Sequence, residues 1–208
     1  MATIDERGKP VITERELHGA KPGDTLRVDE NAILTPLVAD AIKERGIKLE
    51  RVRRRSANRK RVAVGADHGG FEMKEALKRL LADLGHDVQD FGTHSTDAVD
   101  YPDYAHAVAR AVARGTCDLG IVVDGAGIGS CMAANKVPGV RAAMCYDAAT
   151  ARNSREHNDA NVLTLGGKMI SNERMREIVS AWLATDLTED RHRRRVAKID
   201  AIEREYVK

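Results

Sequence analysis

The sequence is poor in aromatic residues, has few cysteines and contains no long apolar run. Aromatic side chains make up 3% of its 208 residues, which argues against the stacking platforms that bind single-stranded nucleic acid. No apolar segment approaches the ~20 residues that a membrane-spanning helix needs. The first residues also lack the apolar core of a signal peptide. We therefore expect neither a nucleic-acid partner nor a membrane partner.

Cysteine and metal-ligand patterns are also missing. Cys117, Cys131 and Cys145 are odd in number and have no CxxC spacing. This is typical of free thiols in a reducing compartment, so we expect a cytoplasmic protein. Histidines and carboxylates do not cluster at metal-ligand spacing, and we expect no metal and no cofactor.

Charged residues are abundant and nearly balanced, with 34 Lys and Arg against 32 Asp and Glu. One segment, RVRRRSANRK at residues 51–60, holds six basic residues. A solvated linker is the ordinary interpretation. A nucleic-acid patch is the alternative, but a short block without flanking basic faces supports it weakly. We therefore predict an N-terminal extension over 1–50, a basic linker over 51–60 and a main domain over 61–208.

The N-terminal extension has few large apolar side chains. Pro36 and Gly46 suit the first position and the end of one helix, with short strands over 25–28 and 47–52. So small a core is marginal, which predicts a small α/β or docking segment that serves attachment. Its LTPxxxDxxxxxGI pattern resembles a short segment of proteins from bacterial microcompartments. That resemblance implies a microcompartment or pathway partner.

Strands and helices alternate from residue 61 onward. RVAVGAD is expected to form a strand and FEMKEALKRLLADLG an amphipathic helix. Further strands are expected in HDVQDFG, CDLGIVVDG, VRAAMCY and NVLTLGG, and the last helix in RHRRRVAKIDAIEREYV. This alternation predicts βαβ units and a mostly parallel sheet, whose ligands gather at the carboxyl ends of the strands.

Two of these strand ends carry candidate chemistry. Asp67 and His68 follow the first strand, in GADHGG, just before a helix start that can attract an anion. Asp124 follows the third strand, in DGAGIG. This loop is not the dinucleotide-binding GxGxxG, and no Walker lysine follows it. Its amides can cradle an oxyanion or a phosphate.

Two polar segments add further candidates. His157 lies in SREHNDANV, where a capped helix end is the structural alternative to a site. Arg191 and Arg195, in RHRRR, are one helical turn apart on one face. Two guanidinium groups at that spacing can clamp a phosphate, with a solvated helix start as the alternative.

In chain order, the motifs GADHGGFEMK, DFGT, DYPDYA, GxGIGxxxAANKVPGVRAA, SREHNDANVLTLG and RHxxR resemble the RpiB/LacA/LacB family of sugar-phosphate isomerases. The resemblance implies a Rossmann-like three-layer α/β sandwich with a five-stranded sheet. It implies a homodimer or dimer of dimers with shared active sites. It also implies metal-free interconversion of an aldose and a ketose phosphate through an enediolate, first of all ribose 5-phosphate and ribulose 5-phosphate.

The resemblance assigns roles to individual residues. Asp67 and His68 lie at the sugar and phosphate end, and His157 assists ring opening. Tyr101 and Asn158 contact the substrate. The phosphate is held by Arg191 and Arg195 together with His68, and the enediolate oxygen by the amides of Gly125, Gly127 and Gly129.

The chain departs from the family pattern at the loop. The best-known members read CGTGIG, with a cysteine base and a threonine that helps to open the ring, where this chain has Asp124 and Ala126. Another branch has a glutamate base where this chain has Ser130. Asp124 is therefore the predicted base. The missing threonine would suit an acyclic substrate such as a tetrose phosphate. An isomerase of another short sugar phosphate and a non-catalytic sugar-phosphate binder are the alternatives.

Overall fold

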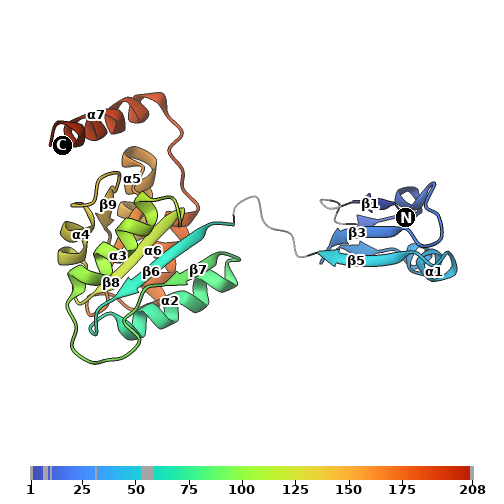
Figure 1. Cartoon of the computed structure of the whole chain (residues 1–208), viewed down its shortest axis with the longest axis horizontal. Coiled ribbons are helices and arrows are strands. Elements are labelled where there is room, and N and C mark those ends of the chain that lie inside the picture. The colour runs from blue at the N-terminus through green and yellow to red at the C-terminus, as the bar shows by residue number, and fades with distance from the viewer. Residues whose placement is uncertain (1, 7–8, 10, 31, 53–58, 207–208) are drawn as a thin grey trace. The chain divides into compact units, whose positions relative to one another are not determined.

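The computed structural model describes residues 2–6, 9, 11–30, 32–52 and 59–206, and the chain divides into two compact units, Met1–Asn58 and Arg59–Lys208 (Figure 1). Most of the predicted basic linker, residues 53–58, lies outside the described residues. Arg51 and Val52, at its start, belong to a strand. Within the described ranges, no helix is both long and apolar enough to cross a membrane.

The N-terminal unit has two small parallel sheets. Its larger sheet has the order β1 (Thr3–Asp5), β3 (Thr25–Asp29), β5 (Lys48–Val52), and its smaller sheet pairs β2 (Val11–Ile12) with β4 (Ile33–Leu34). A 3-10 helix, η1 (Glu14–Leu17), and one α-helix, α1 (Pro36–Glu44), complete it. The predicted strands at 25–28 and 47–52 and the helix that begins at Pro36 are thus confirmed.

The N-terminal unit also has a hydrophobic core of its own. The buried side chains of this core are Ile12, Leu17, Leu26, Val28, Ala32, Val38 and Ile47. They come from both sheets, both helices and the turns between them, and they form one cluster. The unit therefore has an apolar cluster separate from those of the second unit.

The second unit is built on one parallel sheet. Its strand order is β7 (Asp87–Asp90), β6 (Arg61–Ala66), β8 (Leu119–Asp124), β10 (Val162–Gly166), β9 (Ala142–Met144). All four neighbouring pairs are parallel. The central strands β8 and β10 are buried along their whole length because helices cover both faces, which explains their nearly continuous apolar sequences. The five-stranded parallel sheet was predicted and is confirmed.

Helices cover both faces of this sheet (Figure 1). One face packs against α2 (Phe71–Asp83), α5 (Ala148–Asn158) and α6 (Asn172–Leu183), and the other against α3 (Tyr101–Ala113) and α4 (Ile128–Ala134). The last helix, α7 (Asp190–Tyr206), packs against α5. The arrangement is the predicted three-layer α/β sandwich.

The end of α5 and the helix α7 lie at the amino end of the sheet. Arg141, which directly precedes β9, pairs through Nη2 with Asp159 after α5 at 2.9 Å and through Nη1 with Asp200 of α7 at 3.1 Å. The loops after β6, β8 and β10 lie at the opposite, carboxyl end. A five-residue strand of a parallel sheet, at about 3.3 Å per residue, separates the two ends by ~16 Å.

Candidate active site

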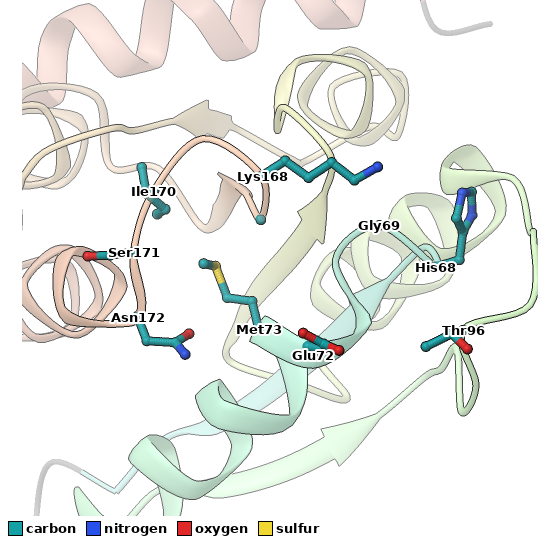
Figure 2. A pocket seen from close by; sticks show the side chains of 10 residues that line it. His68, Gly69, Glu72, Met73, Thr96, Lys168, Ile170, Ser171 and Asn172 are labelled. Atoms are coloured by element: carbon teal, nitrogen blue, oxygen red, sulfur yellow. The ribbon is translucent and has the colours of Figure 1, made fainter.

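A cavity of about 480 Å³ opens at the carboxyl end of the sheet (Figure 2). It lies between the loops that follow β6 and β10 and the first turns of α2 and α6. The residues that line it are His68, Gly69, Glu72, Met73, Thr96, Gly167, Lys168, Ile170, Ser171 and Asn172. A ligand site at this end of the sheet is what the strand pattern predicted.

The turn after β6 is held in place by Asp67. Its carboxylate is buried and accepts the Gly70 N–H through Oδ1 at 2.9 Å. The Asp67 N–H donates to the Val123 carbonyl at 3.3 Å, which joins this turn to the end of β8. The turn therefore lies directly beside the loop that follows β8.

His68 presents one nitrogen to the cavity. Its Nδ1 lies 3.2 Å from both the N–H and the carbonyl oxygen of Val99, so this nitrogen is bound to the backbone. Nε2 is the ring nitrogen left for a ligand, and it can donate to an anion when it carries the hydrogen. His68 lines the cavity next to the start of α2, where an anion is favoured.

Lys168 is a cationic residue of this site that the sequence analysis missed. A Cβ atom at Gly69 would lie 3.4 Å from Lys168 Cε, and the side chain extends over Gly69 in the direction of His68 (Figure 2). Its backbone N–H donates to the Gly125 carbonyl at 3.1 Å, so it is tied to the β8 loop. The available signal was its position two residues after a strand, at the end of the sheet where ligands bind.

Asp124 orders the loop that follows it. Its Oδ1 accepts the N–H of Ala126, at 2.8 Å, and that of Gly127, and its Oδ2 accepts the Ser130 N–H at 2.9 Å. The residue is 4% exposed. Because a carboxylate has about four acceptor positions, roughly one remains for a substrate. Asp124 is therefore a structural element of the loop, whatever else it does.

Two hydroxyl groups hold the loop from the other side. Tyr146 donates to the Ala126 carbonyl at 2.7 Å and Thr164 to the Gly127 carbonyl at 2.8 Å. Gly127 has a φ of 80°, which only glycine adopts at low cost. In the described residues, no acceptor is found for the amides of Gly125, Ile128 and Gly129. These three amides are the ones available to an oxyanion, so of the predicted set Gly127 is already occupied by Asp124.

Tyr101 is brought to this loop from the start of α3. A Cβ atom at Gly129 would lie 2.5 Å from Tyr101 Cζ and 2.7 Å from its hydroxyl oxygen. The ring therefore packs directly on the Gly129 backbone and needs glycine there. Tyr101 remains 39% exposed, so its hydroxyl can also reach a ligand.

A buried ion-pair network supports the wall of the cavity. Lys74 Nζ, fully buried, lies 2.7 Å from Asp90 Oδ2, and Lys78 Nζ lies at the same distance. Asp90 Oδ1 also accepts the Gly92 N–H at 2.9 Å, in the segment that leads to Thr96. Burial acts to raise the pKa of Asp90, but the two ammonium groups outweigh it and lower this pKa to about 2.

The remaining predicted residues lie at the opposite end of the sheet. His157 and Asn158 form the last turn of α5, and the His157 ring stacks on His192 of α7 with 4.1 Å between ring centroids. Arg191 and Arg195 are exposed on α7, and Arg191 Nε lies 2.6 Å from Glu189 Oε2. One chain therefore does not bring the two arginines to His68. The predicted phosphate clamp is not formed within a single chain.

In the described ranges, no group of three or more His, Cys, Asp or Glu side chains is arranged to hold a metal ion. All three cysteines are free thiols, two of them buried.

Comparison with known proteins links this geometry to one family. The family model described as ribose/galactose isomerase matches residues 62–199. Ribose-5-phosphate isomerase B of Escherichia coli (strain K12) is 44% identical over 144 residues, which are 69% of this chain and 97% of that protein.

Solved structures agree with this match. Ribose-5-phosphate isomerase B of Clostridium thermocellum is 47% identical, with a TM-score of 0.70 over 71% of this chain and 99% of that one. The Mycoplasma genitalium enzyme with bound ribulose-5-phosphate is 38% identical, with a TM-score of 0.68 over 70% and 97% of the two chains.

Proposed function

The chain belongs to the ribose/galactose isomerase family, and from this premise we propose that it is an aldose–ketose isomerase that interconverts ribose 5-phosphate and ribulose 5-phosphate. The observation that carries the proposal is the large share of both chains that the match covers. The match takes in almost the whole second unit and 97% of the Escherichia coli enzyme. A cavity lined by His68 and by the cationic side chain of Lys168, at the expected end of the sheet, supports a phosphorylated substrate.

The proton transfer is assigned to the β8 loop. In this proposal Asp124 uses its remaining acceptor position to move the proton between C1 and C2, as a general base. The unoccupied amides of Gly125, Ile128 and Gly129 stabilise the enediolate oxygen. Asp67 and Tyr101, which border the loop, bind the sugar hydroxyl groups.

Ring opening and part of the phosphate binding are assigned to a second copy of the chain. His157, Asn158, Arg191 and Arg195 lie about one strand length from the cavity of their own chain. A two-fold dimer can place the amino end of one sheet against the carboxyl end of its partner. Large exposed apolar side chains beside the loop and on α7 support such an interface: Ile128, Met132, Met169, Ile199 and Ile202. The assembly is a homodimer or a dimer of such dimers.

Turnover of ribose 5-phosphate by the purified full chain tests the function directly. We expect ketose formation and exchange of the C2 proton with solvent. A chain that binds the sugar phosphate without turnover or exchange would be the non-catalytic binder, and the proposal would be wrong.

A mixing experiment tests the shared site. Asp67→Asn alters the carboxyl-end half and His157→Ala the amino-end half, and each variant alone should be nearly inactive. In mixed dimers one of the two sites is intact, so an equal mixture should recover about a quarter of the parent activity by random pairing. No recovery after unfolding and refolding the two together would place the whole site in one chain.

An acyclic substrate is the second candidate, and one observation favours it. Ala126 stands where the family has a ring-opening threonine, and its N–H and carbonyl are already bound by Asp124 and Tyr146. Ring opening then depends on His157 alone. Turnover of a panel of tetrose, pentose and hexose phosphates distinguishes the two candidates. A tetrose 4-phosphate cannot close a furanose ring, so it should be the best substrate under this alternative.

For the N-terminal unit we propose attachment to a pathway or microcompartment partner, so that the enzyme is cytoplasmic either free or enclosed. Three large apolar side chains of this unit support the proposal, Val11, Ile33 and Leu37, with exposed fractions of 44%, 64% and 59%. Val11 and Ile33 are paired neighbours in the β2–β4 ladder. Co-purification of microcompartment shell proteins with the full chain, and not with a chain that begins at Arg59, would support it.

A further inference from the structure

His157 does not stand alone at the end of α5. Its ring lies 4.1 Å from that of His192, with 14° between the planes, so the two imidazoles are stacked face to face. His192 is 2% exposed, whereas His157 is only partly buried. The inner ring therefore forms a fixed platform under the outer one.

The hydrogen bonds around the two rings fix their orientation. Arg191 Nε lies 3.3 Å from His192 Nε2, and because a guanidinium nitrogen only donates, this Nε2 is the acceptor. The hydrogen of the neutral ring is then on Nδ1, which is buried and has no partner in the described residues. The Asn153 amide occupies Nδ1 of His157 at 3.1 Å. The nitrogen of His157 that is left for a ligand is Nε2.

The surroundings also keep the inner ring uncharged. Burial is the largest cause that lowers the pKa of His192 below 6.5, followed by the charge of His157 across the stack. Arg191 and Arg195 act in the same direction, and only Glu189 opposes them. These effects favour the neutral form of His192.

We propose that His192 is a positioning residue for the reaction: its flat ring holds His157 with Nε2 directed at the sugar ring oxygen of the substrate bound by the partner copy. The inference rests on the proposed function, in which His157 gives a proton to the ring oxygen during opening.

Two variants of the full chain test the proposal with ribose 5-phosphate. His192→Phe keeps a flat ring and loses both nitrogens, whereas His192→Leu fills the space without a flat ring. We expect the Phe variant to keep kcat within about threefold, and the Leu variant to lose about ten- to a hundredfold in kcat, the scale of a misplaced catalytic group. KM should change alike in both, because each variant removes the nitrogen that accepts from Arg191 and leaves Arg195 in place.

Thermal unfolding establishes that each variant is folded at the assay temperature, and His192→Met, which also lacks a flat ring, replaces the Leu variant if that one does not fold. A Leu variant with kcat within twofold of the parent, or a Phe variant as slow as the Leu variant, would overturn the proposal.

If the parent itself does not isomerise ribose 5-phosphate, the proposed function fails instead. The proton resonance of His157 Cε1 then decides. It should shift upfield in the parent and in the Phe variant relative to the Leu variant, and equal shifts in all three would overturn the stacking role.

Discussion

Replacement of Asp124 separates a catalytic role of its carboxylate from a structural one. Asp124→Asn cannot be a neutral change, because three backbone N–H groups donate to the two carboxylate oxygens. The amide offers one oxygen and one NH₂ group, so at least one buried N–H loses its acceptor. That loss costs ~1–3 kcal/mol. For a chain of this size, the melting temperature should fall by roughly 2–10 °C.

The same substitution removes the proposed base. Turnover should fall by ~10²–10⁴, and exchange of the substrate proton with solvent should fall with it. A disordered loop could lower both as well, so this variant does not decide the question alone. Thr164→Val is the matched control, because it removes the hydroxyl that donates to the Gly127 carbonyl and leaves the carboxylate in place. We expect a similar loss of stability from it, with turnover within about tenfold of the parent.

Asp124→Cys distinguishes the two roles. A thiol cannot accept the three amides as the carboxylate does, but its thiolate can remove a proton. With a thiol pKa of ~8.5, turnover of this variant should rise by about tenfold per pH unit between pH 6 and 8 and level off above. If the Cys and Asn variants are equally slow at every pH, Asp124 only orders the loop, and the base has to be sought elsewhere, first at Asp67.

Four further predictions follow from the described contacts. Arg195→Ala should raise KM for the sugar phosphate about ten- to a hundredfold, because one charge-assisted bond contributes ~1.5–3 kcal/mol. The control is Arg194→Ala, at the exposed neighbouring residue, and equal KM values for the two variants would refute the phosphate clamp. A chain that begins at Arg59 should stay folded and active, as judged by melting and turnover, since the second unit has its own cores; insolubility or loss of turnover would make the N-terminal unit part of the enzyme. Ionised Asp90 should stabilise the fold by roughly 1–2 kcal/mol above pH 4. Because its pKa is lowered to about 2 in the folded chain, this contribution disappears as the pH falls from 3.8 toward 2. The difference in melting temperature between the parent and Asp90→Asn should therefore shrink from pH 7 to pH 3, and a constant difference would contradict the prediction. Activity should survive a chelator, and loss that a divalent ion restores would show that the acid–base assignment is incomplete.

The sheet and its helices could be predicted because their sequence patterns are local. The apolar strands of the second unit alternate with helical segments such as FEMKEALKRLLADLG, which ends at Gly85, and the structure has these elements within a few residues. Helix α4 begins at Ile128, inside the glycine loop. Its first turn is fixed by Asp124, a contact that no periodicity reveals.

The site was harder to predict because it depends on which residues meet in space. Motif order named His68, Tyr101 and the glycine loop, and the structure brings these to one end of the sheet. Motif order did not reveal that Asp124 accepts three backbone amides, nor that Lys168 extends over Gly69. Both facts depend on side-chain directions in loops, where the sequence carries no period. The burial of single apolar residues was also hard to predict. Leu37, at the start of α1, is 59% exposed, whereas its neighbour Val38 is fully buried.

The separation of His157 from the cavity has a consequence for how activity responds to the amount of protein. If each complete site takes one half from each of two chains, an isolated chain has no working site at all. At chain concentrations below the dissociation constant of the dimer, the rate then grows with the square of the chain concentration. Dilution would abolish activity while the separate chains remain folded. A cell that doubles synthesis of the chain in this range would gain about fourfold in flux. In such a shared-site dimer, the rate of isomerisation would depend on the abundance of the chain as well as on that of the substrate.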